Sequence, residues 1–461
     1  MNNGNQSALD SDRIGWLLLK LTLPAFLGMF VITLYNVVDT IFIGHYVGSL
    51  GIAGLSIVFP IQMLSMGVGM MTGIGGASLI SRLIGAGNKD RAERALGNAI
   101  TSTVVLSAII TIAGLSNVDF WLRVMGASET ILPYARDYMT IILYGMFFQT
   151  YAMALNGLIR AEGNARVPMT GMIIGAVLNI IFCAIFIITL HMGVKGSALA
   201  AVTGQLVSVV YLMSYYFGGK SFLKIRWSNL VPELSILRDI LAIGVASLAM
   251  TLAGSLSAVF VNRALITYGG DLAVSTFGII NRIMMFALMP GMTVGQGLQP
   301  ILGYNYGAKR YGRALKAIKI AIVFATAFGV LAFLVLYFAP EPFVGIFTTD
   351  SELIALGTYA AKRLFLAMYL VGFIMVGSTI FQAIGKVAQS FVTAISRPAL
   401  FLLPLIFILP HYWELDGVWM AYPITDALTF LLTLVLLIPQ IRDFRRKDIL
   451  SRGAVMGVRP D

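Results

Sequence analysis

The sequence has little that could bind a metal or cross-link the chain. Its 461 residues include one cysteine, Cys183, and three histidines, His45, His191 and His411. A single thiol can form no disulfide within the chain and no thiolate metal site. The histidines fall at the ends of apolar segments far apart in sequence, so they form a metal site only if the fold gathers them. We expect no bound cofactor.

Charged residues are also scarce. They make up 11% of the chain, whereas a soluble domain carries about 25%. The apolar residues instead form twelve long runs, and a helix needs about 20 such residues to cross a bilayer with its backbone polar groups satisfied. The sequence therefore predicts an all-α membrane protein. The predicted spans are Trp16–Ile43, Ala53–Ile80, Ala92–Leu115, Tyr134–Ile159, Val167–Leu190, Val194–Phe217, Leu237–Tyr268, Leu272–Tyr304, Ala314–Ala339, Leu353–Ile384, Ala388–Leu409 and Leu415–Ile438.

Several sequence motifs of catalysis are missing. No phosphate-binding Gly-x-x-x-x-Gly-Lys-Ser/Thr sequence is present, which argues against direct coupling to ATP. No nucleophile elbow and no metalloprotease helix is present either. We therefore expect that the chain is not an enzyme.

The basic residues are distributed unevenly between the predicted connections. If odd-numbered spans run outward, about 25 of the 32 Lys and Arg residues lie on the inner side. This asymmetry predicts a multi-pass protein of the cell inner (cytoplasmic) membrane with both termini in the cytoplasm. The net charge of +11 then indicates contact with the lipid bilayer rather than with nucleic acid.

Short sequences recur at an offset of about 220 residues, at equivalent points of two halves. Six spans per half is an even number, so both halves insert the same way up. This predicts two six-helix bundles related by a pseudo-two-fold axis along the membrane normal, an architecture of transporters with a cleft between the bundles. The paired sequences are Gly87–Leu96 with Gly307–Leu315, Ile159–Gly163 with Phe381–Gly385, and Gly196–Ala200 with Gly417–Ala421.

The repeat also predicts the domain boundaries. Residues 1–217 form an N-lobe with the first six helices, and residues 237–440 form a C-lobe with the other six. Residues 218–236 are a cytoplasmic linker between the lobes, and residues 441–461 are a cytoplasmic tail.

Two carboxylates fall within predicted spans. Asp39 lies in the outer half of the first span and Asp426 near the middle of the last. A charge at membrane depth costs about 2.5–3.5 kcal/mol, so such residues usually have a function. Asp39 could bind H⁺ or Na⁺, or balance a cationic substrate. For Asp426, a substrate-binding role and a structural ion pair with Arg282 or Arg397 are both open.

Neutral polar residues accompany each carboxylate, and several could serve as ligands. Amide and hydroxyl oxygens near Asp39 would suit Na⁺, which prefers oxygen ligands, although each could instead form an interhelical hydrogen bond. Methionines and aromatic residues could line an adaptable apolar cavity. The candidates are Asn36, Asn156, Asn179, Thr203 and Gln205 in the first half, Asn262, Asn281, Arg282, Gln296 and Gln299 in the second, and Met284, Met285, Met289, Met292, Tyr35, Phe59, Phe147, Tyr369 and Phe373 for the cavity.

Three stretches resemble the MATE family, the multidrug and toxic compound extrusion transporters, in its bacterial and archaeal branch. They are Tyr35–Gly44, Gln299–Ala308, and Leu178–Phe182 followed by the Gly193–Gly196 loop. The resemblance covers essentially the whole chain. It implies export driven by inward H⁺ or Na⁺, with Asp39 and Asn179 in a cation site, and an acidic residue at position 426 that faces substrate in some relatives.

The chain departs from the family pattern at three positions. Cys183 stands where relatives usually have a second aspartate, Ala201 where they have a threonine (Thr203 is two residues on), and Ala246 where they tend to have proline. Cation coupling through the family's usual ligands is therefore open. Asp39 could carry H⁺ alone, or Asp426 could share the task.

We expect a cation-coupled antiporter that exports lipophilic, often cationic drugs or metabolites by alternating access, as a monomer acting on small molecules. Asp39, Asn179, Asn36 and Thr203 would couple the cation, with Na⁺ at Asp39 and Asn179 as one option. Substrate would contact Asp426, Arg282, Asn281, Gln299, Tyr35 and Met285. The alternatives are a flippase for lipid-linked saccharides or lipids, which would need more cationic groups, and a non-transporting membrane sensor or scaffold.

Overall fold

The structure, a computed structural model, describes residues 8–11 and 13–455, with side-chain positions except at 8, 36, 40, 49 and 452–455. This part of the chain is helical and contains no strand. The long helices are α1 (Ile14–Tyr46), α2 (Ser49–Gly85), α3 (Lys89–Ser116), α5 (Leu132–Ala161), α6 (Arg166–Cys183), α7 (Gly193–Phe217), α8 (Leu234–Gly307), α9 (Tyr311–Phe338), α11 (Ser351–Leu364), α12 (Met368–Ile384), α13 (Val387–Ile395) and α14 (Leu403–Val455). Short elements are η1 (Ala8–Asp10), α4 (Val118–Val124), η2 (Ala184–Thr189), η3 (Trp227–Leu230), α10 (Glu341–Gly345) and η4 (Ser396–Leu402).

Ten helical stretches of the described chain are long and apolar enough to cross a membrane. Two of them are far longer than one crossing needs, and each contains a break with positive φ. α8 breaks at Gly270, with φ 64°, and the stretch that ends in α14 breaks at Glu414, with φ 49°. Dividing both at these points gives twelve spans, which confirms the twelve predicted from the sequence.

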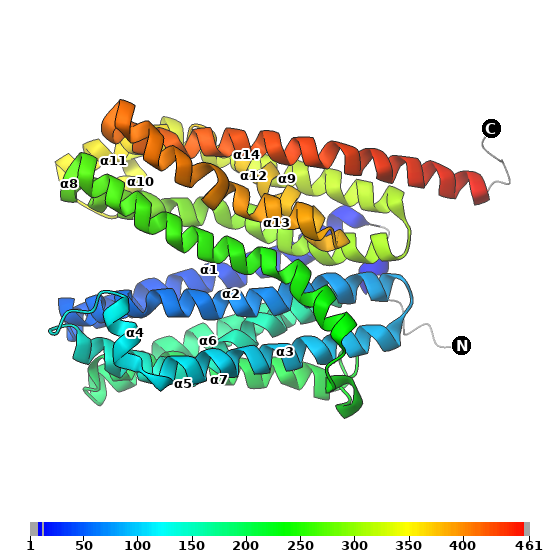
Figure 1. Cartoon of the computed structure of the whole chain (residues 1–461), viewed down its shortest axis with the longest axis horizontal. Helices are drawn as coiled ribbons and strands as arrows, with labels where there is room; N and C mark the ends of the chain where they lie inside the picture. Colours follow the sequence, from blue (N-terminus) through cyan, green and yellow to red (C-terminus); the bar gives the residue numbers. More distant parts are fainter. Residues whose placement is uncertain (1–7, 12, 456–461) are drawn as a thin grey trace. The chain divides into compact units, whose positions relative to one another are not determined.

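The chain forms two compact units. Unit 1 contains Leu23–Thr251 with η1, and unit 2 contains Ser11–Thr22 and the chain from Leu252 onward. The first turns of α1 therefore belong to unit 2, and the first turns of α8 to unit 1. The lobe boundaries predicted at residues 217 and 237 stay a prediction. Figure 1 shows the long helices of each bundle running alongside one another.

Glycines let the helices of unit 1 approach closely. A Cβ at Gly73 of α2 would lie 3.0 Å from Ala154 Cα of α5, and one at Gly157 would lie 2.9 Å from the Gly73 carbonyl carbon. Gly175 of α6 and Gly204 of α7 meet in the same way, with 2.7 Å between a Cβ at Gly204 and Gly175 O. Small residues are the usual means of tight packing between membrane helices, where no hydrophobic effect drives association.

Unit 2 has a large apolar core. Trp419 and Phe365 are fully buried in it, and Phe277 of α8 stacks on Trp419 with ring centroids 6.4 Å apart. α9 and α12 pack so closely that a Cβ at Gly372 would collide with Ala325 O.

The fifth span of each half contains a π-helical segment. η2 continues α6 in unit 1, and η4 joins α13 to α14 in unit 2. π-Helical turns are rare and frequently occur at functional sites because they displace side chains from the regular helical register. Each of the two segments adjoins a different one of the carboxylates described next.

Candidate functional site

Asp39 of α1 accepts two hydrogen bonds on the same oxygen. The Cys183 thiol donates to Asp39 Oδ1 at 3.1 Å, and the Ser197 hydroxyl donates to it at 3.0 Å. Cys183 and Ser197 are fully buried and come from the end of α6 and the start of α7. Three helices of unit 1 thus converge on one carboxylate within a span.

The local chain geometry explains this convergence. Cys183 is the last residue of α6 before η2 begins. Gly196 lies where a Cβ would be 3.1 Å from the Phe186 backbone, so a larger residue would push α7 away from η2. The turn between them contains positive φ at His191 (51°) and Gly193 (57°). This tight turn brings Ser197 to Asp39.

Asn179 and two tyrosines complete the polar surroundings of Asp39. Asn179 is buried one turn before Cys183, and its Oδ1 lies 3.7 Å from the Cys183 sulfur. Tyr35 and Tyr138 lie within electrostatic range of Asp39. The Tyr138 hydroxyl accepts a hydrogen bond from Gln62 at 3.3 Å. The cluster therefore offers hydrogen-bond donors and a few oxygen atoms to a cation that binds at Asp39.

Not every residue predicted for the cation site joins the cluster. The Thr203 hydroxyl donates to Leu199 O of its own helix at 2.8 Å, as threonines in helices often do. The side chain of Asn36 lies outside the described residues. Within the described chain, no group of three or more His, Cys, Asp and Glu side chains could hold a metal ion. Ser197 was missed by the sequence analysis because a serine near a loop gives no signal of its tertiary partner.

Asp426, the second predicted carboxylate, forms a buried ion pair. Arg397 Nε donates to Asp426 Oδ1 at 2.6 Å and Arg397 Nη2 to Oδ2 at 3.4 Å, and 3% of the Asp426 side chain is exposed. Arg397 lies in η4, where the Ser257 hydroxyl donates to Pro398 O at 2.6 Å. Of the two arginines considered from the sequence, the structure thus brings Arg397, rather than Arg282, to Asp426.

Four of the other predicted substrate contacts lie in unit 2 and differ in exposure. Asn281 and Arg282 are exposed, and Met285 is 54% exposed, whereas Gln299 is buried. These four residues all lie on α8 after its break.

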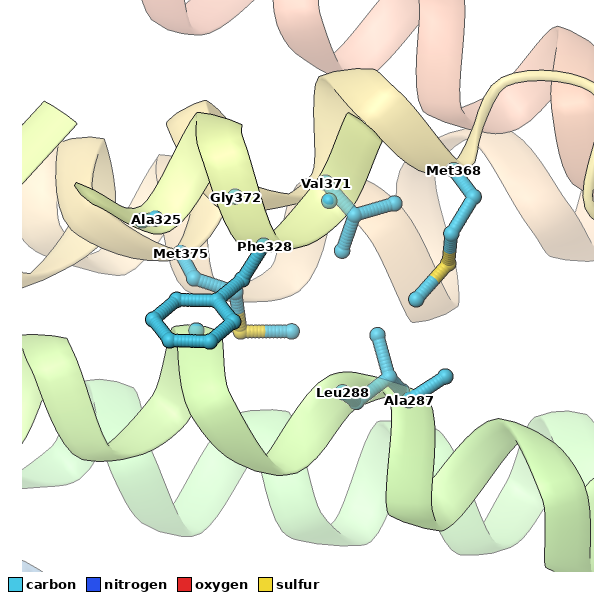
Figure 2. Close-up of a pocket in the computed structure, with 10 residues that line it drawn as sticks. Ala287, Leu288, Ala325, Phe328, Met368, Val371, Gly372 and Met375 are labelled. Atoms are coloured by element: carbon cyan, nitrogen blue, oxygen red, sulfur yellow. The ribbon is translucent and has the colours of Figure 1, made fainter. Parts of the chain in front are cut away.

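Unit 2 also contains a small apolar cavity, partly open to its surroundings, between the second part of α8, α9 and α12 (Figure 2). In Figure 2, Leu288 of α8 faces Met368, Met375 and Phe328 across it. Flexible methionines adapt to ligands of different shape. The methionines predicted for such a cavity lie on α8, whereas those that line it come from α12. The full lining is Ala287, Leu288, Gly291, Ala325, Phe328, Gly329, Met368, Val371, Gly372 and Met375.

Twelve apolar helices in two bundles, with carboxylates held inside the spans, are typical of a secondary transporter. The model of the MatE family matches residues 24–185 and 242–408, and the chain therefore belongs to this family of membrane transporters. The resemblance to MATE proteins seen in the sequence is thus confirmed.

Known relatives are similar over nearly the whole chain. The multidrug export protein MepA of Staphylococcus haemolyticus is 27% identical over 87% of this chain and 88% of its own. A solved structure of the MATE multidrug transporter DinF-BH is 41% identical, covers 94% of this chain and 98% of its own, and has a TM-score of 0.87. A crystal structure of MATE in complex with MaL6 is 27% identical, with a TM-score of 0.91 over 96% of this chain and all of its own.

Proposed function

We propose that the chain is a cation-coupled antiporter that exports lipophilic, often cationic small molecules. The observation that carries the proposal is that Asp39, a carboxylate within a span, accepts hydrogen bonds from Cys183 and Ser197. A membrane helix keeps such a residue chiefly for a function. The relatives support the substrate class, since MepA is a multidrug export protein and DinF-BH a multidrug transporter.

We infer that H⁺ rather than Na⁺ is the coupling ion. Na⁺ needs several oxygen ligands in place of water. The α6 atom that contacts Asp39 is the Cys183 sulfur, a soft ligand that suits a hard cation poorly. Asn179 could supply an oxygen from that helix, and its Oδ1 lies 3.7 Å from the same sulfur. A proton needs only the carboxylate itself.

The coupling would act through the hydrogen bonds of Asp39. An ionised carboxylate accepts both hydrogens strongly, whereas a protonated one accepts them more weakly and adds a hydrogen of its own. Protonation would therefore loosen α1 from α6 and α7. α1 contains Pro24, which removes one backbone hydrogen bond and gives the helix a place to bend. The proton drives alternating access only if it binds the outward-open and inward-open states with different affinity.

The substrate would bring an apolar part and a positive charge. The small cavity lined by Met368, Met375 and Phe328 offers an apolar surface that the apolar part of such a compound would contact. Asp426 is neutralised by Arg397, so we propose that its charge is not free to bind substrate unless that pair opens.

The proposed cellular setting follows from the basic connections. The chain would act as a monomer in the cytoplasmic membrane, with both termini inside, and would take its substrates from the cytoplasm or inner leaflet. The positive-inside rule supports this orientation.

The proposal is tested by expression in a bacterial host that lacks its own multidrug pumps. Cells with the wild-type chain should tolerate higher concentrations of lipophilic cations, and cells with Asp39→Asn should not, at equal amounts of protein in the membrane. Tolerance that is equal in the two would reject the role of Asp39. No tolerance with either chain would reject the substrate class.

A further inference from the structure

The connection between α7 and α8, residues 218–233, belongs to unit 1 and lies folded against α3 and the end of α5. We call it the strap. Neutral groups of α3 hold the backbone of its second part by hydrogen bonds, and Arg94 of α3 also lies 3.6 Å from the Glu233 carboxylate. Asn98 Nδ2 donates to Asn229 O at 3.3 Å and to Val231 O at 3.2 Å, and its Oδ1 accepts from Glu233 N at 2.7 Å. The Thr101 hydroxyl donates to Leu230 O at 2.8 Å. None of the groups in these four hydrogen bonds titrates in the ordinary pH range.

The first part of the strap is fixed by carboxylates instead. Glu162, directly after α5, is 5% exposed and accepts hydrogen bonds from Ser221 Oγ at 2.9 and 2.8 Å on its two oxygens. The Phe222 amide donates to it at 2.8 Å, and the Tyr215 hydroxyl at 3.2 Å. Glu93 of α3, which is 3% exposed, accepts from the Lys224 amide at 3.2 Å.

The two carboxylates differ in their charged neighbours. Glu93 has Arg226 Nε at 3.9 Å, whereas Glu162 forms no ion pair among the described residues. Tyr215 and Tyr216 of α7 lie close to Glu162. Other charges border the site. Lys89 lies 4.7 Å from the centroid of the Phe222 ring, and Arg160 lies in the last turn of α5, two residues before Glu162. Lys220 and Lys224 flank the strap's contact with Glu162.

Burial raises the pKa of Glu162 to about 7, and the bonds from Ser221, Phe222 and Tyr215 lower it only in part. The site can accept the proton. A protonated Glu162 can donate to Ser221 Oγ, whose own hydrogen can go to Leu223 O at 2.7 Å. Both protonation states of Glu162 are therefore compatible with a closed strap, but burial favours the neutral one.

We propose that the strap is a proton-sensitive latch, closed most firmly when Glu162 is protonated and loosened when it ionises. In an open strap Glu162 meets water and its pKa returns towards the ordinary value of about 4.3. The closed strap thus binds the proton more tightly than the open one. The stability that the closed strap gains from the proton on Glu162 is complete below the ordinary pKa of about 4.3. It is lost as the pH rises through about 7. Because the strap leads into α8, loosening it would free the start of that helix.

Hydrogen–deuterium exchange of the purified full-length protein tests the latch. After correction for intrinsic exchange, opening at Phe222 and Leu223 should increase about twentyfold between pH 5.5 and pH 7.5. Glu162→Gln, which is always neutral, should remove this pH dependence. Glu93→Gln, which alters the carboxylate of α3 that contacts the same strap, should keep it. The measurement uses no substrate, so its result does not depend on transport.

Two outcomes would overturn the latch: wild-type opening that does not change with pH, or the same pH dependence in Glu162→Gln. If Glu162→Gln does not fold, Ser221→Ala replaces it. Loss of the hydroxyl that bridges both Glu162 oxygens should raise opening at Phe222 several-fold at every pH. Unchanged opening in that variant would also overturn the proposal.

Discussion

The side chain of Asp39 accepts hydrogen bonds from two neighbours, and each of these two residues has a distinct consequence for coupling. Ser197 supplies a hydroxyl from α7, and Cys183 supplies a thiol from α6. A hydrogen bond to a charged group contributes about 1.5–3 kcal/mol, more than a neutral one. We therefore treat Ser197 as the residue that positions Asp39 and Cys183 as the residue that determines which cation the site accepts.

Removal of the Ser197 hydroxyl should weaken coupling. Ser197→Ala leaves Asp39 with the weaker thiol donor, so we expect cation-driven efflux to fall about tenfold, in line with the loss of one charge-assisted bond. Ser197→Thr, which keeps a hydroxyl, should retain most activity. Ser208→Ala is the matched control, because that hydroxyl on the same helix bonds to Gly171 O. Equal loss in the Ser208 and Ser197 variants would show that the effect is not specific to Asp39.

A carboxylate at position 183 should change the ion preference. Cys183→Asp would place a second carboxylate against Asp39 and near Asn179, which adds oxygen ligands for Na⁺ where the natural chain has a sulfur. We expect this variant to gain efflux driven by an inward Na⁺ gradient, measured in everted membrane vesicles. Cys183→Ser should stay insensitive to Na⁺. A correctly inserted Cys183→Asp with no response to Na⁺ would contradict our account of ion choice.

At the scale of elements, the spans were predictable and the π-helices were not. Each span is a long apolar run, and the bilayer leaves the backbone of such a run little alternative to a helix. The breaks at Gly270 and Glu414 fell between predicted spans because the apolar runs end there. η2 and η4 carry no such sequence signal. The contacts of Ser197 and Arg397 depend on these segments, so the sequence named both carboxylates but could not settle their partners.

The ion pair between Asp426 and Arg397 joins α14 to η4 and should contribute to stability. Asp426→Asn would leave the Arg397 charge buried without its partner, which typically costs about 3–5 kcal/mol. We expect a lower melting temperature in detergent, partly restored by Arg397→Met in the double variant. If Asp426 bound substrate instead, the single variant would change efflux of cationic compounds while melting at the wild-type temperature.

At the scale of the whole molecule, the sequence repeat and the twelve spans were sufficient to predict the architecture, and three short motifs to predict the family. Membership is confirmed by the MatE match to both halves of the chain and by solved MATE structures with TM-scores of 0.91 and 0.87. The apolar cavity of unit 2 was harder to foresee, because its lining combines α8, α9 and α12, whose contributing residues are far apart in sequence.

The most direct measurement uses the purified protein in liposomes that contain no Na⁺. A pH gradient is imposed so that protons flow in the direction opposite to export, and the movement of a fluorescent lipophilic cation is followed. We predict transport by the wild-type chain that collapses when the pH gradient is dissipated, and none by Asp39→Asn. Transport by Asp39→Asn at the wild-type rate, or wild-type transport that needs Na⁺ and ignores the pH gradient, would contradict proton coupling at Asp39.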